Sequence, residues 1–247
     1  MRKPTFLLLL STLILASCAY DNEQEMFPHV VIPDSIIRGQ VAWFTLDSEL
    51  TDKLGQVDPL RFWGSLEWSR DHSYTDNAAL NLDGVEDYLS GYLGVYDSLA
   101  VSLWFMPLPN YRKAYLFDYG IGRFAAGLDA ISSATMPAFN LFIQNDTSTY
   151  VLPDLINYFY WHHLYMEIGD SLVPPRFFID GFRREFNDTI RRMHPLTDLF
   201  YLGRPCNADI LDESLYRGMI DEIRIFNTFL TEDEINSLYW EGKAGHL

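Results

Sequence analysis

Cysteine and basic side chains are scarce in this 247-residue chain, which has two cysteines, Cys18 and Cys206. No disulfide framework can form from so few thiols, so the stability must come from the core, where we expect Cys206 to be buried. Lys and Arg number 18 against 34 Asp and Glu, which gives a formal net charge of −16. Because this charge repels phosphate backbones, the composition argues against nucleic-acid binding.

The apolar run near the N-terminus is shorter than the roughly 18–20 residues that a transmembrane helix needs. Arg2 and Lys3 precede it, and it extends from Phe6 to Ala16, as in a signal peptide. Leu15-Ala16-Ser17-Cys18 resembles the bacterial lipobox. We therefore expect a lipoprotein signal peptide at 1–17, cleavage before Cys18 and lipid on Cys18. The alternative is an ordinary secretory signal with an incidental cysteine.

Residues 18–37 have little tendency to form regular structure and are expected to be a flexible tether. They are polar and acidic, and they contain Pro28 and Pro33. Acidic residues soon after Cys18 resemble a signal for export to the outer surface in some Gram-negative bacteria, while the alternative is a solvated spacer. The expected location is the cell envelope, with the lipid in the outer membrane and the domain exposed at the cell surface.

From residue 38 to 247 the pattern is that of one all-β domain. Hydrophobic residues make up 48% of the chain and aromatic residues 15%, which suffices for a buried core. Runs rich in aromatic and β-branched residues alternate with Gly, Pro, Asn and Asp, as in a sandwich or barrel. One helix is expected, at 232–240. The expected strands are 39–46, 78–82, 87–91, 98–107, 114–120, 124–130, 139–145, 149–153, 161–169, 175–186, 199–204 and 218–226.

Six segments in order resemble the laminin-G-like family of the concanavalin A-like superfamily. The most informative is GMIDEIRIFNTFLTEDEINSLY at 218–239, a strand followed by a helix with a capping box at Thr231 and Glu234. The resemblance implies a two-sheet antiparallel jelly roll with a short C-terminal helix, and a module that recognises glycans or surface proteins. The other five segments are WFTLDSELTDKLG (43–55), ALNLDGVEDYL (79–89), VSLWFMPLP (101–109), WHHLYMEIGD (161–170) and FFIDGF (177–182).

The same resemblance implies a structural Ca²⁺ between the opening loop and the last strand. Asp47, Asp52 and Asp221 match the family's acidic positions, although Ser48 departs from the usual Gly or Asn. Carboxylates suit Ca²⁺, which takes six to eight oxygen ligands. The alternative is that Asp47 and Asp52 accept turn hydrogen bonds and Asp221 is a solvated or capped strand residue.

Carbohydrate binding would use aromatic rings, on which sugars stack their apolar faces. Trp63 and Trp68 lie in a loop-rich insert at 61–74, where exposure is expected. Tyr158 and Tyr160 belong to NYFYWHHLY (157–165), the densest aromatic stretch. For each of these rings the alternative is core packing.

The motifs of common enzyme classes are missing. The Glu-x-Asp-x-x-Glu strand of the sandwich glucanases is absent, and so are the Gly-x-Ser-x-Gly, P-loop and dinucleotide fingerprints. Strand alternation would put Asp221 and Glu222 on opposite faces, where they cannot act as a pair. We expect a non-catalytic module, most simply one that binds carbohydrate. The alternatives are a protein-binding adhesion or assembly subunit and a divergent glycoside hydrolase or lyase.

The lipid prediction has a direct test. Cells expressing the chain and fed a palmitate analogue should label the wild type, and Cys18→Ala should abolish the label because the thiol and the new amine are the acceptors. Labelling is read by gel fluorescence. An unlabelled wild type, or a label that survives the substitution, would contradict the lipobox.

Overall fold

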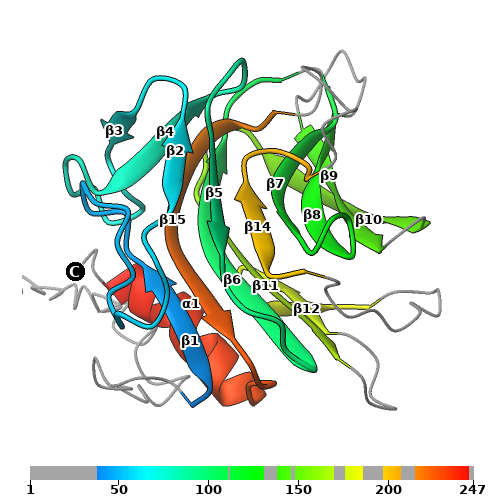
Figure 1. The fold of residues 1–247 in the computed structure, drawn as a ribbon. Coiled ribbons are helices and arrows are strands. Elements are labelled where there is room, and N and C mark those ends of the chain that lie inside the picture. Colours follow the sequence, from blue (N-terminus) through cyan, green and yellow to red (C-terminus); the bar gives the residue numbers. More distant parts are fainter. Residues whose placement is uncertain are drawn as a thin grey trace, which may run out of the picture. The chain divides into compact units, whose positions relative to one another are not determined.

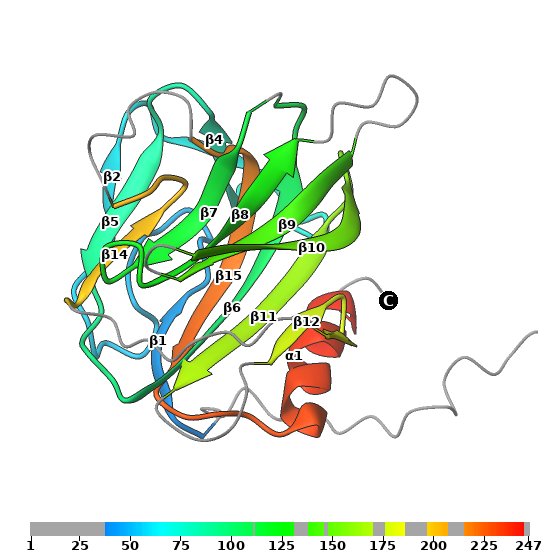
Figure 2. The same cartoon turned by 90° about the vertical axis from the view of Figure 1, so that its right-hand side faces the viewer.

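Two antiparallel β-sheets stacked face to face form the described part of the chain (Figures 1 and 2). The computed structural model describes residues 38–110, 112–130, 138–145, 148–169, 176–185, 197–206 and 215–244. The expected signal peptide and tether lie outside these residues. Within them, no helix has the length and apolar character needed to cross a membrane.

Sheet A has eight strands and carries the C-terminal helix on its outer face. The long strand β15 lies near its centre and pairs with β6 and β4, while β1 pairs with another part of β15. In order across the sheet the strands are β13 (Phe182–Arg184), β12 (Phe177–Ile179), β11 (His162–Gly169), β6 (Ser98–Pro107), β15 (Arg217–Phe226), β4 (Ala79–Asp83) and β3 (Glu67–Ser69), with β1 (Gln40–Phe44) beside β15.

Sheet B has seven strands and forms the opposite layer, in front of β6, β11 and β15 in Figure 2. Neighbouring strands are antiparallel throughout. In order across the sheet they are β10 (Ser148–Asn157), β9 (Ala138–Asn145), β8 (Phe124–Ala130), β7 (Ala114–Tyr119), β14 (Leu199–Leu202), β5 (Tyr88–Tyr92) and β2 (Arg61–Trp63).

The expected all-β jelly roll with a C-terminal helix is confirmed. The expected strands all appear within a few residues of their bounds, and 175–186 divides into β12 and β13 at a two-residue turn. Asp180 and Gly181 form that turn with φ of +53° and +76°, the left-handed values that a tight hairpin needs. The insert at 61–74, expected to be a loop, instead supplies β2 to sheet B and β3 to sheet A.

The core lies between the sheets and follows the two-residue period of the strands. In β6, Leu99, Val101, Leu103 and Phe105 face inward and are fully buried in the main apolar cluster. The alternate residues of β6, which include Trp104, face the opposite side of sheet A. Each large apolar side chain removed from water stabilises the fold by about 1.5–3 kcal/mol, so this layer supplies much of the stability.

Helix α1 (Glu232–Ala244) begins at the expected capping box. The backbone N–H of Thr231 donates to Glu234 Oε2 at 2.6 Å, and the N–H of Glu234 donates to Thr231 Oγ1 at 3.2 Å. The helix packs on the outer face of sheet A through a separate apolar cluster (Figure 1). That cluster consists of Ala100, Tyr165, Phe178, Phe226, Leu230, Ile235 and Leu238.

A buried polar network joins the segment before α1 to sheet A. Glu167 of β11 is fully buried and accepts hydrogen bonds from Arg176 Nη2 at 3.0 Å and from the Tyr165 hydroxyl at 2.8 Å. Arg176 also donates to the Leu230 carbonyl, and the Tyr165 hydroxyl accepts from the Leu230 N–H. Burial raises the pKa of Glu167, so the carboxylate depends on Arg176 to stay ionised.

Replacing Arg176 with Met should therefore lower the free energy of unfolding by about 3–5 kcal/mol near neutral pH, because a buried carboxylate loses its counter-ion. A carboxyl with a raised folded-state pKa costs stability above its unfolded pKa. The loss should therefore shrink as the pH falls toward about 4, where the unfolded chain also binds the proton. Urea unfolding at several pH values measures both effects.

Arg183→Met is the matched control, because Arg183 is 46% exposed and its ion pairs with Glu185 and Glu232 lie at the surface. It should cost less than about 1 kcal/mol. Equal losses for the two variants would show that the buried network does not stabilise the fold.

Candidate functional site

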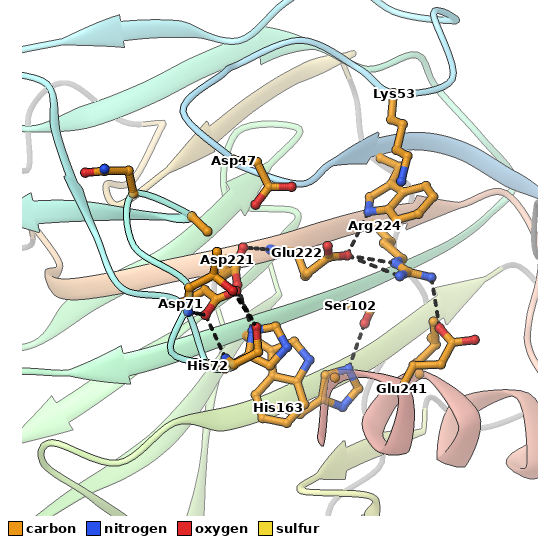
Figure 3. Close-up of a pocket in the computed structure, with 18 of the residues that line it drawn as sticks. Asp47, Lys53, Asp71, His72, Ser102, His163, Asp221, Glu222, Arg224 and Glu241 are labelled. Atoms are coloured by element: carbon orange, nitrogen blue, oxygen red, sulfur yellow. Dashed lines mark hydrogen bonds and ion pairs between the residues drawn. The ribbon is translucent and has the colours of Figure 1, made fainter. Parts of the chain in front are cut away.

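A cavity of about 720 Å³ opens on the outer face of sheet A (Figure 3). Strands β1, β6, β11 and β15 form its floor, and the loop before β4, the loop after β1 and helix α1 surround it. Its basic side chains are Lys53 and Arg224. We call it the acidic cavity after its six carboxyl side chains, Asp47, Asp71, Asp76, Asp221, Glu222 and Glu241.

A β-bulge in β15 places Asp221 and Glu222 in the same cavity. The pairing of β15 with β6 shifts between Asp221 and Arg224, and Glu222 has a φ of +51°. The expectation that the two carboxylates lie on opposite faces is therefore wrong, because an extra residue interrupts the alternation. A left-handed conformation at a residue other than glycine costs of order 1–3 kcal/mol and is concentrated at functional sites.

Glu222 organises one side of the cavity. Its Oε2 accepts hydrogen bonds from Trp43 Nε1 at 2.7 Å and from Arg224 Nε and Nη2, both at 3.2 Å. Arg224 also pairs with Glu241 of α1 at 3.5 Å, and its guanidinium lies 4.2 Å from the centre of the Trp43 ring. Both cavity cations therefore have partners, since Lys53 lies 3.9 Å from the Trp43 ring.

His72 and Asp221 form a buried pair on the other side. His72 Nδ1 lies 2.7 Å from Asp221 Oδ2, and the second oxygen of Asp221 accepts the Glu222 N–H. Burial lowers the pKa of His72. Burial also raises the pKa of Asp221 well above its usual range, with further repulsion from Glu222, Asp71 and Asp47. Both shifts disfavour an imidazolium–carboxylate ion pair at this position.

Trp104 supports the floor of the cavity. Its indole stacks on His72 at 4.5 Å between ring centres and on Tyr239 of α1 at 5.7 Å. A Cβ at Gly242 would lie 2.6 Å from the indole, so only glycine lets the helix approach this closely. His163 donates to or accepts from Ser102 at 2.9 Å, and burial lowers its pKa to about 3, which keeps the imidazole neutral.

The three residues expected to hold Ca²⁺ do not form one cluster. Asp47 and Asp221 line the acidic cavity, whereas Asp52 does not. Asp52 Oδ1 accepts the N–H groups of Trp43 and Leu54, and Oδ2 accepts those of Gln56 and Val57. Because each of its oxygens already accepts two backbone N–H groups, Asp52 does not fit a Ca²⁺ site. These bonds are the turn hydrogen bonds of the alternative interpretation.

A second candidate lies on the outer face of sheet B, where β2, β5 and β14 run side by side. Trp63 stands opposite Tyr88 with ring centres 5.8 Å apart, and its Nε1 donates to Ser90 at 3.0 Å. Their neighbours Phe62, Leu89 and Phe200 pack against the core, so these rings face outward. We call the outward-facing group the aromatic row, consisting of Arg61, Trp63, Tyr88, Tyr201 and Arg204.

Aromatic rings and guanidinium groups contact one another along this row. Arg61 lies 5.0 Å from the centre of the Trp63 ring, and Arg204 lies 4.5 Å from Tyr88 and 5.3 Å from Tyr201. Trp63 is 42% exposed. The row therefore combines three aromatic rings with two positive charges, on a chain that is otherwise strongly acidic.

The four expected ligand-binding rings separate into different environments. Trp63 belongs to the aromatic row, but Trp68 lies in β3 of the other sheet and packs against the core. Tyr158 is 6% exposed and belongs to the core cluster, which corrects its expected role as a binding surface. Tyr160 is 66% exposed and lies between β10 and β11.

Some functional residues were not foreseen. No role was predicted for Asp71 and His72, which lie in the insert at 61–74. An Asp-His pair next to Ser73 and Thr75 resembles many polar turns, so the residues alone carry no distinguishing signal. Their proximity to Asp221 depends on long-range strand pairing, which local sequence does not reveal.

Comparison with known proteins agrees with this architecture. A family model described as the concanavalin A-like lectin/glucanases superfamily matches residues 83–236. Domain 4 of an extracellular arabinanase from Geobacillus stearothermophilus, solved with arabinotriose, has a TM-score of 0.61 and 18% identity, over 81% of this chain and 98% of that one. A search of curated proteins found no significant match.

Toxin domains show the same fold over part of their length. The binding domain of botulinum neurotoxin DC, solved in a complex with SialylT, has a TM-score of 0.58 and 12% identity. The receptor-binding domain of the botulinum neurotoxin C/D mosaic serotype also has a TM-score of 0.58, with 11% identity. Each match covers 82–83% of this chain but only 51% of the toxin chain.

Asp52→Ala should lower the free energy of unfolding by about 2 kcal/mol, because three loop N–H groups and that of Trp43 in β1 lose a charged acceptor. Asp47→Ala is the control. Asp47 is an exposed carboxylate in the same loop and should change stability by no more than about 0.5 kcal/mol. Chemical denaturation measures both. A melting temperature that rises with Ca²⁺ in the wild type but not in Asp52→Ala would instead restore Asp52 as a calcium ligand.

Proposed function

Because the chain belongs to the concanavalin A-like lectin/glucanases superfamily, we propose that its domain is a non-catalytic carbohydrate-binding module. The aromatic row on sheet B is the binding surface in this proposal. The observation that carries it is the 42% exposed Trp63, which contacts Arg61 of the same strand, β2, and Tyr88 of the neighbouring strand, β5.

The chemistry of the row suits a sugar chain. The C–H faces of sugar rings pack on aromatic side chains, and sugar hydroxyls accept hydrogen bonds from guanidinium groups. Because β2, β5 and β14 are held in one sheet, the rings are positioned before a ligand arrives, which lowers the entropic cost of binding. An extended surface of this kind fits several sugar units along a chain better than it fits one enclosed monosaccharide.

Two solved neighbours favour a glycan as the ligand class. The arabinanase domain was solved with arabinotriose and a toxin binding domain with SialylT, and both share the fold at low identity. The absence of the Glu-x-Asp-x-x-Glu strand from the sequence supports a role in binding rather than cleavage.

The lipobox supports a place for this module in the cell envelope. With lipid on Cys18 and a tether at 18–37, the domain would be held at a membrane surface while the aromatic row remains free to meet a glycan. Lipid chains contribute roughly 0.8 kcal/mol for each buried CH₂ group, so this attachment would be lasting.

Trp63→Ala should weaken glycan binding roughly thirtyfold, because loss of a central aromatic anchor costs about 2 kcal/mol. The purified chain is screened on a glycan array, and affinities for the best ligand are then measured by calorimetry. Trp240→Ala is the matched control, since Trp240 is also 42% exposed but lies on α1, next to sheet A. It should leave the affinity unchanged.

Other outcomes point to other functions. If the wild type binds no glycan on the array, the carbohydrate proposal fails. If glycan binding survives Trp63→Ala but is lost in Tyr160→Ala, the binding surface lies at the exposed Phe159–Tyr160 segment instead.

A further inference from the structure

We propose that Asp71, His72 and Asp221 bind a divalent transition-metal ion, with Zn²⁺ as the natural probe. Within the described ranges this is the one group of three or more His, Cys, Asp or Glu side chains whose potential ligand atoms all lie within 4.8 Å of one another. The site is separate from the aromatic row, since it lies on the outer face of sheet A.

The three side chains converge from two elements that are distant in sequence. Asp71 and His72 come from the loop between β3 and β4, and Asp221 comes from the bulge in β15 (Figure 3). His72 Nδ1 and Asp221 Oδ2 are 2.7 Å apart and share a hydrogen bond that an ion would replace. Two ligands of one tetrahedral zinc ion lie roughly 3.3 Å apart, so the two side chains would have to separate by roughly 0.6 Å to admit it.

The surrounding residues hold the ligands in place. The His72 ring stacks on Trp104 and meets Trp161 edge-on at 5.9 Å, which fixes its orientation. Asp71 Oδ1 accepts the N–H groups of Ser73 and Thr75, so its loop is closed around the carboxylate. Among the described residues, Asp71 Oδ2 accepts only the Ser73 hydroxyl, at 2.6 Å, so this oxygen keeps one lone pair for a metal, unlike the oxygens of Asp52, which each accept two N–H groups.

The charge of the cavity favours a cation. Asp71 and Asp221 are both buried, and Asp47, Asp76, Glu222 and Glu241 line the same cavity. Arg224 is occupied by Glu222 and Glu241, and Lys53 lies over Trp43. A divalent ion would supply positive charge beside Asp221, whose two oxygens are bonded to the His72 imidazole and to the Glu222 N–H.

The donor set decides which ion is bound. One imidazole nitrogen and two carboxylate oxygens are typical ligands of Zn²⁺ and its neighbours, whereas Ca²⁺ takes oxygen ligands alone. Three protein ligands leave at least one position open. All three residues line a cavity of about 720 Å³, with room for water or for a hydroxyl group of a bound molecule.

The test is a calorimetric titration of the untagged chain with ZnCl₂ after removal of metals with EDTA. We expect one ion per chain with a Kd of about 1 μM or tighter, and a melting temperature that rises with Zn²⁺ concentration. Millimolar Ca²⁺ should not displace the zinc. Absence of zinc binding to the wild type overturns the proposal.

Asp221→Asn and His72→Gln should each weaken zinc binding by about tenfold or more, since each removes one ligand. Asp47→Asn and Asp76→Asn are controls that remove carboxylates of the same cavity outside the cluster, and they should change the affinity by less than about threefold. Zinc binding that is lost in Asp47→Asn but kept in His72→Gln contradicts the assignment. Trp63→Ala should bind zinc normally, which separates this test from the glycan test.

A measurement on the wild type avoids dependence on variants that fail to fold. Crystals soaked in Zn²⁺ should show an anomalous scattering peak about 2.1 Å from His72 and from the two carboxylates. A zinc peak elsewhere on the chain, with none at this cluster, overturns the proposal.

Discussion

The pairing of β15 is the constraint on which the rest of the structure depends. This strand bonds to β6 along most of its length, to β4 at one end and to β1 at the other. Its inward side chains belong to the core, its bulge presents Asp221 and Glu222 to the acidic cavity, and its C-terminus leads into α1. A one-residue shift in the pairing of β15 would turn its core-facing side chains outward and its cavity-facing side chains inward. The core and the cavity therefore depend on the same strand register.

Most strands and the helix could be predicted from local patterns in the sequence. The strand pattern of 98–107, the order of strand and helix in 218–239 and the Thr231–Glu234 capping box are local signals, and the structure has each feature at the expected place. The short strands β2 and β3 were missed because three-residue pairs are stabilised by their partners β5 and β4 rather than by their own composition.

The candidate sites were harder to predict, for physical reasons that differ between residues. Asp221 and Glu222 were expected on opposite faces because a bulge is a property of paired strands and cannot be seen in one strand. Asp52 resembles a metal ligand in sequence, but a carboxylate that accepts four backbone N–H groups has the same spacing as one that binds an ion. Trp63 and Trp68 are five residues apart, yet they belong to opposite layers because the chain crosses between sheets at that point.

Gly242 of α1 lies against the Trp104 indole, and its lack of a side chain affects the shape of the cavity. Any larger side chain would force α1 or the indole to shift, because its Cβ would lie 2.6 Å from a ring that already stacks on His72 and Tyr239. Glu241 precedes this glycine and forms part of the cavity wall. The distance between α1 and the floor of the cavity therefore depends on residue 242 being a glycine, which has no Cβ. Related chains that carry alanine or a larger residue here should have a wider cavity, even where every polar residue is retained.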